Sequence, residues 1–373
     1  MRIDTRILES PGVQEIYITA LAQAGLDFQV EAREIFSRIK EILRHTGGRI
    51  FQERIFAGRQ ELEALNAVRH EVYGSLDDGV DPALLVVSDG GYGAFAGVQV
   101  HAVHGESAPR PLDLGEKECG RVLDIGGRRW VSGSAVSGRE AGPSAVDQAH
   151  VMLEKAERLL VAAGGDLRSL ARTWMWLGDI LSWYDGFNRV RTRFFRDKGI
   201  MDGAEGSYMP ASTGVGVGSA DGIPCTMDLV AVIESGPAIR HLTEIGNQRS
   251  AFDYGSAFSR ASLADMPAGK TIFISGTADI DQRGRTCHIG NASEQIAATI
   301  ENVRAVLHDL DCPENGIVQA IAYCKTPEVE SVLRDRWSDL GWPMMIGIAD
   351  ICRDNLLFEV EATAAAGARV AVL

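Results

Sequence analysis

The sequence has no hydrophobic run that approaches the roughly 18 to 20 residues a helix needs to cross a membrane. Its first twelve residues, MRIDTRILESPG, also lack the apolar segment of a secretory signal peptide. We therefore expect a cytoplasmic protein without a membrane partner.

Paired cysteines are also lacking. The six cysteines are scattered and form no C-x-x-C pair: Cys119, Cys225, Cys287, Cys312, Cys324 and Cys352. This distribution favours reduced thiols over a disulfide framework or a zinc site. The histidines show no spacing typical of metal ligands either. We predict a protein that has no metal and no cofactor.

Basic residues are outnumbered, with 37 Lys and Arg against 51 Asp and Glu, which gives a formal charge of −14. This balance argues against nucleic acid as a partner, because its phosphates require a basic surface. A few local arginines can still bind an anionic small molecule. The 373 residues exceed what one compact core usually needs, so we expect at least two packed units.

An internal repeat is present. Residues 129–135 (RWVSGSA) and 272–278 (IFISGTA) share an apolar strand that ends in Ser-Gly, a hydroxyl residue and Ala. Each is followed by an amphipathic helix, at about 145–160 and 292–307, with apolar residues three and four apart. A strand, a second helix, a proline-marked turn and late strands then follow in both copies. The matched order predicts two tandem units of one α+β fold.

These boundaries divide the chain into four parts. Residues 118–236 and 267–373 form the two repeats, and 237–266 form an ordered connector. Residues 1–117 contain two helical patterns and two strand patterns. They are either a degenerate third unit or an α/β elaboration packed on the first repeat.

The second repeat resembles a known family. Residues 273–278 (FISGTA), Gln295, 301–303 (ENV) and 353–362 (RDNLLFEVEA) closely resemble the RidA/YjgF pattern. The resemblance implies a chorismate-mutase-like α+β unit, a mixed sheet backed by two helices. Such units usually assemble as trimers with sites in the clefts between them. Trimer-like packing in a homo-oligomer or within one chain is compatible with two tandem copies.

The whole-chain layout is similar to the chorismatases, which hydrolyse the enolpyruvyl ether of chorismate. The similarity is most specific at residues 170–174 (LARTW), 184–191 (YDGFNRVR), 209–216 (MPASTGVG) and 350–353 (DICR). The resemblance implies a hydrolase of secondary metabolism that acts on an anionic small molecule.

Glu359 matches the strand-borne glutamate of RidA proteins and the acid of chorismatases. Strand alternation places Glu359, Glu361 and Leu357 on one face. A carboxyl among apolar neighbours would have a raised pKa, as a general acid requires at neutral pH. The alternative is a solvent-facing acid on an edge strand. We expect Glu361 to be structural.

Chorismate has two carboxylates, so its binding calls for arginines. Arg172 lies inside an apolar strand, where it either pairs with a buried acid or binds a ligand. Arg191 on a helix and Arg353 beside the Glu359 strand are the other candidates.

Three further residues complete the predicted site. Backbone N–H groups at Gly276 and Thr277 could approach a substrate carboxylate, although many strands end in such a turn for geometric reasons alone. Tyr323 could form a wall of the pocket or belong to the core.

Two other functions compete. The RidA-type enamine or imine deaminase uses an arginine shortly after the proline turn, and here Ser212 and Met345 occupy those positions. Neither can form the salt bridge. The third reading is a non-catalytic small-molecule-binding protein. The first repeat has no certain counterpart of Glu359, with Asp228 the nearest acid, so we expect one site per chain.

Overall fold

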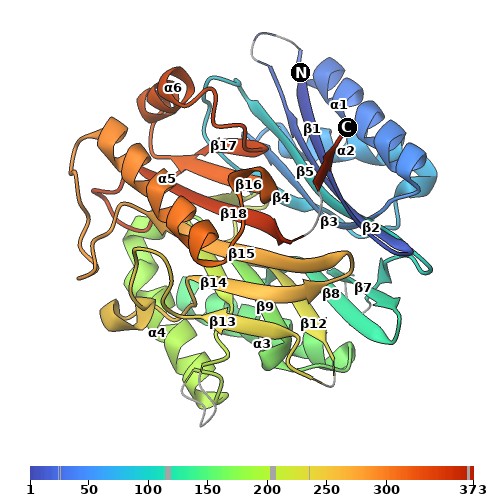
Figure 1. Ribbon diagram of the computed structural model, residues 1–373. Coiled ribbons are helices and arrows are strands. Elements are labelled where there is room, and N and C mark those ends of the chain that lie inside the picture. Colours follow the sequence, from blue (N-terminus) through green and yellow to red (C-terminus); the bar gives the residue numbers. More distant parts are fainter. Residues whose placement is uncertain are drawn as a thin grey trace.

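The computed structural model describes residues 1–23, 25, 27–112, 114, 119–201, 207–234, 236–367 and 370–373. The strands form three mixed sheets, and the helices α1 to α6 lie on the outer sides of these sheets (Figure 1). The α+β class and the mixed sheets backed by helices are confirmed. No helix in the described part of the chain has the length and apolar character to span a membrane.

Residues 2–104, which we call unit 1, make up most of the N-terminal segment. Its elements are β1 (Arg2–Ser10), β2 (Val13–Leu21), α1 (Phe28–Thr46), β3 (Arg49–Ala57), α2 (Leu62–Tyr73), β4 (Ala83–Val86) and β5 (Phe95–His104). The five strands lie in the order β4-β3-β5-β2-β1. This segment is a complete third unit, because the same strand order recurs in both repeats.

Unit 2 contains β7 (Gly120–Ile125), β8 (Arg128–Ser137), α3 (Ala145–Ala162), β9 (Leu170–Leu177), α4 (Ile180–Asp197), β10 (Ala211–Val215) and β12 (Cys225–Ile233). Unit 3 contains β14 (Ala261–Met266), β15 (Gly269–Ala278), α5 (Ala292–Asp309), β16 (Ile317–Cys324), α6 (Pro327–Arg336), β17 (Met344–Ile348) and β18 (Phe358–Ala366). Their strand orders are β10-β9-β12-β8-β7 and β17-β16-β18-β15-β14. In all three units the third and fourth strands pair in parallel, as their connection through a helix requires.

Short strands extend these sheets at their edges: β6 (Arg110–Pro111), β11 (Gly218–Ser219), β13 (Ile239–Leu242) and β19 (Val370–Val372). Both β13 and β14 lie in residues 237–266, the stretch expected to be a connector. β14 pairs with β15 and therefore starts the sheet of unit 3.

Side-chain caps set the beginnings of the two predicted amphipathic helices. Ser144 accepts a hydrogen bond from Asp147 N at the start of α3, and Asn291 accepts one from Glu294 N at the start of α5. Each cap satisfies a backbone N–H that has no partner within the helix. The helices thus begin where the sequence pattern predicts.

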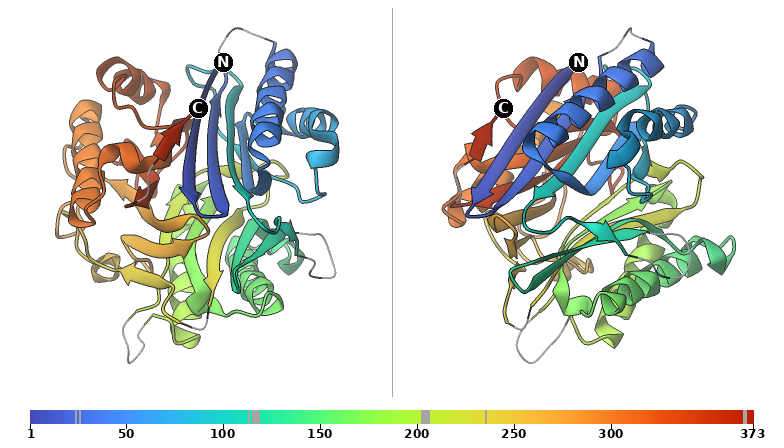
Figure 2. Two further views of the ribbon diagram at one scale, coloured as in Figure 1. Left: turned by 45° about the vertical axis from the view of Figure 1, so that its right-hand side comes forward. Right: turned by 90° about the vertical axis from the view of Figure 1, so that its right-hand side faces the viewer.

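The sheets meet in the middle of the molecule and the helices lie outside (Figure 2). Each interface between units contains a buried polar contact: Arg54 Nε with Asp228 Oδ2 (2.7 Å, units 1 and 2), Arg172 Nη2 with Glu361 Oε2 (2.7 Å, units 2 and 3), and Gln99 Nε2 with Ala320 O (2.9 Å, units 1 and 3). Three units of one topology are thus packed in a ring within one chain, with clefts between them.

Candidate active site

Glu359 lies in the interior of a sheet. β18 is between β15 and β16, where Glu359 pairs with Ala278 and Tyr323. The residue is 5% exposed. The alternative of a solvent-facing acid on an edge strand is therefore wrong.

A cavity beside Glu359 opens at the interface of units 2 and 3. Its lining combines the acid with three arginines, two aromatic rings and small polar groups: Tyr184, Arg191, Ser212, Gly214, Ser256, Phe258, Arg260, Gly276, Ala278, Ile280, Cys352, Arg353 and Glu359. Of the predicted site residues, the structure brings together Glu359, Arg191, Gly276 and Arg353. Arg172, Thr277 and Tyr323 are not in this lining.

Burial raises the pKa of Glu359 to about 8, and the nearby charge of Glu361 acts in the same direction. Arg172, Arg260 and Arg353 offset part of this effect because they favour the carboxylate. With a pKa near 8, most molecules hold Glu359 protonated at neutral pH. A buried proton donor at a cavity is what general-acid catalysis requires.

Gly276 lets the β15 backbone pass directly against the Glu359 carboxyl. A Cβ at this position would lie 2.1 Å from Glu359 Oε1. The glycine is thus needed for this close approach, whereas Thr277 turns away and donates its hydroxyl to Ser275 O (2.8 Å).

We expect Gly276→Ala to lower kcat for the reaction proposed below by at least tenfold, because the added methyl must displace the Glu359 carboxyl from its place. Gly236→Ala is the control, since its methyl meets no atom within 4 Å. Steady-state kinetics of both variants provide the measurement. Unchanged kinetics in Gly276→Ala would show that the carboxyl does not need this position.

Arg191 comes from α4 and is 1% exposed. Its Nη2 donates to Asn188 Oδ1 (2.7 Å), while its buried Nε has no hydrogen-bond partner among the described residues. Phe187 and Phe258 pack near the guanidinium, at 5.1 and 5.8 Å from their ring centres. Arg191 is thus held in place with donor capacity left for an anion.

Arg353 and Arg260 complete the cationic lining. Arg353 Nη1 donates to Gly284 O (2.5 Å), and Arg260 Nε donates to Arg249 O (2.8 Å). Sequence reasoning missed Arg260, which directly precedes β14. The one sequence feature that could have indicated Arg260 is its position two residues after Phe258, in a stretch with aromatic and charged residues.

Arg172 lies behind this cavity, in the contact between units 2 and 3. Its Nη2 is 2.7 Å from Glu361 Oε2, and Trp174 Nε1 donates to the other oxygen of Glu361. Of the two alternatives for Arg172, the structure shows pairing with a buried acid. Tyr323 is also fully buried, and its hydroxyl has no hydrogen-bond partner in the described part of the chain.

The cavity volume is about 40 Å³, which has room for a few water molecules. A pocket for a ring-sized substrate usually has roughly 300 Å³ or more, so substrate entry requires the lining side chains to move apart. Long side chains such as Tyr184, Phe258 and Arg260 form much of this lining.

Burial raises the pKa of the Cys352 thiol to about 12, so it is neutral here. Among the described residues, no group of three His, Cys, Asp or Glu side chains is placed to hold a metal ion.

In the cleft between units 1 and 2, the strand that corresponds to β18 is β12, and it places no acid in the lining. Of the residues of β12, the cavity in this cleft is lined by Thr226, which has no acidic group. Asp228, the nearest acid, instead binds Arg54 across the interface.

Comparison with known proteins bears on the fold. No protein-family model matches the sequence, and no curated protein matches it. Among solved structures, a chorismatase covers 96% of this chain and 99% of its own length, with a TM-score of 0.60 and 19% identity. A putative endoribonuclease from Thermotoga maritima covers 34% of this chain and 97% of its own length, with a TM-score of 0.28 and 20% identity. A YjgF family member from Neisseria meningitidis covers 34% of this chain and 93% of its own, with a TM-score of 0.27 and 17% identity. The chain therefore has the fold of the chorismatase along nearly its whole length.

Proposed function

We propose that this chain is a hydrolase that cleaves the enolpyruvyl ether of a carboxylated small molecule, chorismate or a close relative. The observation that carries the proposal is a buried glutamate with a pKa of about 8 at a cavity that three arginines line. The similarity to a chorismatase over 96% of the chain supports the same reaction class.

In this mechanism Glu359 donates its proton to the terminal methylene carbon of the enol ether. A C–H bond forms, and the ether oxygen stabilises the resulting oxocarbenium ion. Water then adds to the cationic carbon, and the Glu359 carboxylate takes up a proton from it. Collapse of the hemiketal breaks the C–O bond and releases pyruvate and the ring alcohol, so one water molecule is consumed and Glu359 ends protonated.

The arginines have a binding role in this proposal. The substrate carries carboxylates, and guanidinium groups bind carboxylates through paired N–H donors. Arg191 of α4, together with Arg260 and Arg353 from the segments before β14 and β18, lines the cavity. Their positive charge also matches the anionic partner expected from the sequence.

Incubation of the purified protein with chorismate, followed by assay of pyruvate, tests the proposal. We expect Arg191→Ala to raise KM roughly tenfold or more, because a hydrogen bond to a charged group is lost. Arg189→Ala is the matched control, since Arg189 is exposed on the same helix. Absence of pyruvate from folded protein would refute the proposal. Turnover of 2-aminoacrylate instead would identify an imine deaminase, and binding without turnover a non-catalytic protein.

The pH dependence of kcat follows from the raised pKa of Glu359. Only the protonated acid can donate, so activity is present below the pKa and lost as pH rises through about 8. We expect kcat measured between pH 6 and 10 to fall tenfold per unit above this midpoint. A constant kcat up to pH 9.5 would contradict a role for Glu359 as proton donor.

A further inference from the structure

Two buried acids lie next to each other on one face of β18: Glu359 and Glu361, which are 5% and 4% exposed. Side chains two residues apart in a strand point the same way and lie about 7 Å apart. Both acids face unit 2, because Glu359 lines the cavity between units 2 and 3 and Glu361 contacts Arg172 across the same interface. Two negative charges at this spacing repel each other strongly where water is excluded.

The two acids differ in their hydrogen bonds. Oε2 of Glu361 accepts from Arg172 Nη2 (2.7 Å), and its Oε1 accepts from Trp174 Nε1. Both partners can only donate, so Glu361 is held as a carboxylate. No hydrogen bond from a described residue reaches the Glu359 carboxyl, which faces the cavity instead. Of the two acids, Glu361 therefore carries the negative charge and Glu359 the proton.

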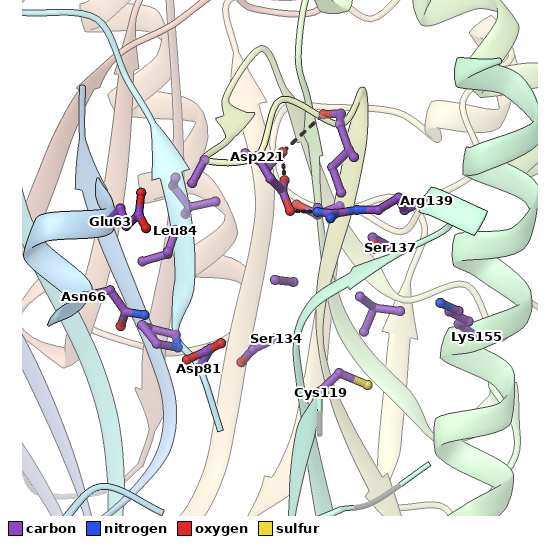
Figure 3. A pocket seen from close by; sticks show the side chains of 18 of the residues that line it. Glu63, Asn66, Asp81, Leu84, Cys119, Ser134, Ser137, Arg139, Lys155 and Asp221 are labelled. Atoms are coloured by element: carbon purple, nitrogen blue, oxygen red, sulfur yellow. Dashed lines mark hydrogen bonds and ion pairs between the residues drawn. The ribbon is translucent and has the colours of Figure 1, made fainter. Parts of the chain in front are cut away.

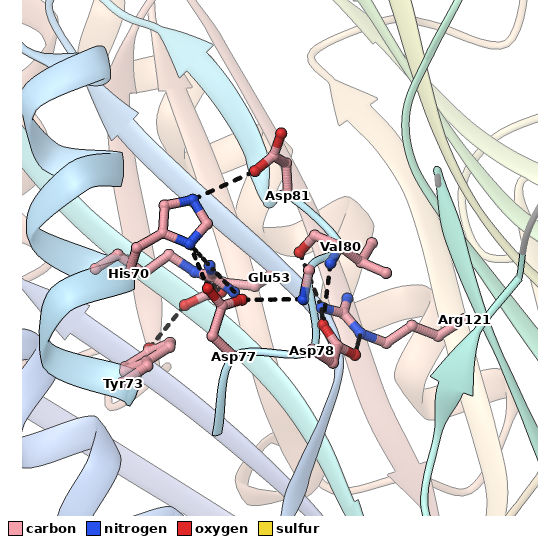
Figure 4. A network of polar contacts seen from close by, with 10 residues as sticks. Glu53, His70, Tyr73, Asp77, Asp78, Val80, Asp81 and Arg121 are labelled. Carbon is pink, nitrogen blue, oxygen red and sulfur yellow. Dashed lines mark hydrogen bonds and ion pairs between the residues drawn. The ribbon is translucent and has the colours of Figure 1, made fainter. Parts of the chain in front are cut away.

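A buried acid with its own donors also occurs in unit 1. Glu53 on β3 is 1% exposed, and it accepts from Arg69 Nε (2.6 Å) and Tyr73 Oη (2.7 Å) (Figure 4). Glu361 resembles this paired acid. Glu359 does not, so it is the acid on β18 that can release and regain a proton.

The larger cavity between units 1 and 2, with a volume of about 940 Å³, has no such pair of acids among its described lining residues. Glu63 and Asp81 lie on one wall, and Asp221 pairs with Arg139 (Figure 3). These three acids and Glu140 are exposed or half-buried. A buried pair of acids thus distinguishes the smaller cavity.

Cations surround Glu359. They are Arg172 of β9, Arg191 of α4, Arg260 before β14 and Arg353 before β18, and each favours the carboxylate. The other titratable groups are Tyr184 of α4, Tyr323 of β16 and the Cys352 thiol. Burial and, next, the charge of Glu361 raise the pKa of Glu359 against these cations. Among the described residues named here, Glu361 is the one charged group that favours the protonated acid.

We propose that Glu361 is a positioning residue of the Glu359 site: its carboxylate, held by Arg172 and Trp174, repels negative charge at Glu359 and so keeps the proton on that acid. This role rests on the hydrolysis proposed above, in which Glu359 is the proton donor. The contact between units 2 and 3 thus has two effects. It holds the units together, and it sets how strongly the acid retains its proton.

Carbon NMR titration of the Glu359 carboxyl in Glu361→Gln tests this role without relying on turnover. Glutamine keeps the shape of the side chain and removes its charge. We expect the midpoint to fall from about pH 8 by roughly one to two pH units, the effect of one charge about 7 Å away at the effective dielectric of a protein. Glu361→Asp keeps the charge and should restore most of this shift.

Asp228→Asn is the matched control. It removes the acid of another buried interface ion pair, with Arg54 (2.7 Å), and should leave the midpoint near pH 8.

The pH profile of kcat gives a second readout. Activity is lost as pH rises through the Glu359 midpoint, so in Glu361→Gln we expect kcat to fall roughly tenfold at pH 8 and to stay within about twofold of the natural value at pH 6. A purely structural role would lower kcat equally at both pH values.

If Glu361→Gln does not fold, the double variant Arg172→Leu with Glu361→Leu replaces it, because it leaves no buried charge unpaired. Its midpoint should also fall, since Glu361 affects the pKa of Glu359 more strongly than Arg172 does. A midpoint near pH 8 in either folded variant would overturn the role of Glu361, as would an equal fall in Asp228→Asn. A lowered midpoint in a protein that releases no pyruvate from chorismate would refute the hydrolysis alone and leave this electrostatic role in place.

Discussion

Glu359→Gln should lower kcat for enolpyruvyl ether hydrolysis by about a thousandfold, because general-acid catalysis contributes roughly 10²- to 10⁴-fold. Glutamine has nearly the same shape and fits beside Gly276, but it has no acidic proton to donate. Substrate affinity should change little, since the three arginines remain. The measurement is kcat and KM for pyruvate release, with Arg189→Ala as an exposed control. Full activity in Glu359→Gln would exclude this residue as the acid.

The same variant should also change how stability depends on pH. The folded protein holds a proton on Glu359 up to about pH 8, whereas the unfolded chain loses it near the ordinary value of 4.5. The folded state of the natural protein therefore binds more protons in this window, and its free energy of unfolding falls as pH rises from about 4.5 to 8. Glu359→Gln has no carboxyl at this position, so its free energy of unfolding should not fall in this way. The difference in free energy of unfolding, variant minus natural protein, should therefore rise between pH 4.5 and 8 by on the order of 4 to 5 kcal/mol, measured by urea denaturation at several pH values. A difference that does not vary with pH would contradict the raised pKa.

Arg172→Leu should lower the free energy of unfolding by about 3 to 5 kcal/mol, because it leaves the buried Glu361 carboxylate without its guanidinium partner. The combined variant Arg172→Leu with Glu361→Leu should lose much less, since no buried charge remains unpaired. Urea denaturation of both single variants and the double variant measures this coupling. The exposed Arg189→Ala should stay within about 0.5 kcal/mol of the natural protein.

This experiment also distinguishes the two roles considered for Arg172. A substrate ligand would leave stability nearly unchanged on substitution while KM rises tenfold or more. A residue that stabilises the interface between units 2 and 3 would lower the free energy of unfolding by several kcal/mol on substitution. The first outcome would contradict the structural role that the contact with Glu361 and Trp174 indicates.

The sequence predicted two of the three units because their second strands carry Ser-Gly: RWVSGSA in β8 and IFISGTA in β15. The corresponding strand of unit 1, β2, reads IYITAL in residues 16–21 and has no glycine. Without that marker the N-terminal segment could not be told apart from an elaboration. The segment is recognised as a third unit only from the order of its strands in the sheet, and that order results from pairing between segments far apart in the sequence.

Glu359 and Gly276 could be predicted as site residues because a short local pattern marks each of them. The pattern is the strand alternation around Glu359 and the Ser-Gly strand end at Gly276, and the two strands are adjacent in the sheet. The partner of Arg172 was not predictable in the same way, since Glu361 lies 189 residues away and meets it only when units 2 and 3 pack together. Arg260 was missed for a similar reason, because its approach to Glu359 depends on how β14 joins the sheet.

Titration of the Glu359 carboxyl shows whether this residue is a neutral acid at physiological pH, as the proposed mechanism requires. Carbon NMR of protein labelled at the glutamate side-chain carboxyls would identify the Glu359 signal by its absence in Glu359→Gln. We expect this signal to titrate with a midpoint near pH 8. A signal that has completed its titration below pH 6 would exclude Glu359 as the proton donor, because the residue would then be a carboxylate at neutral pH.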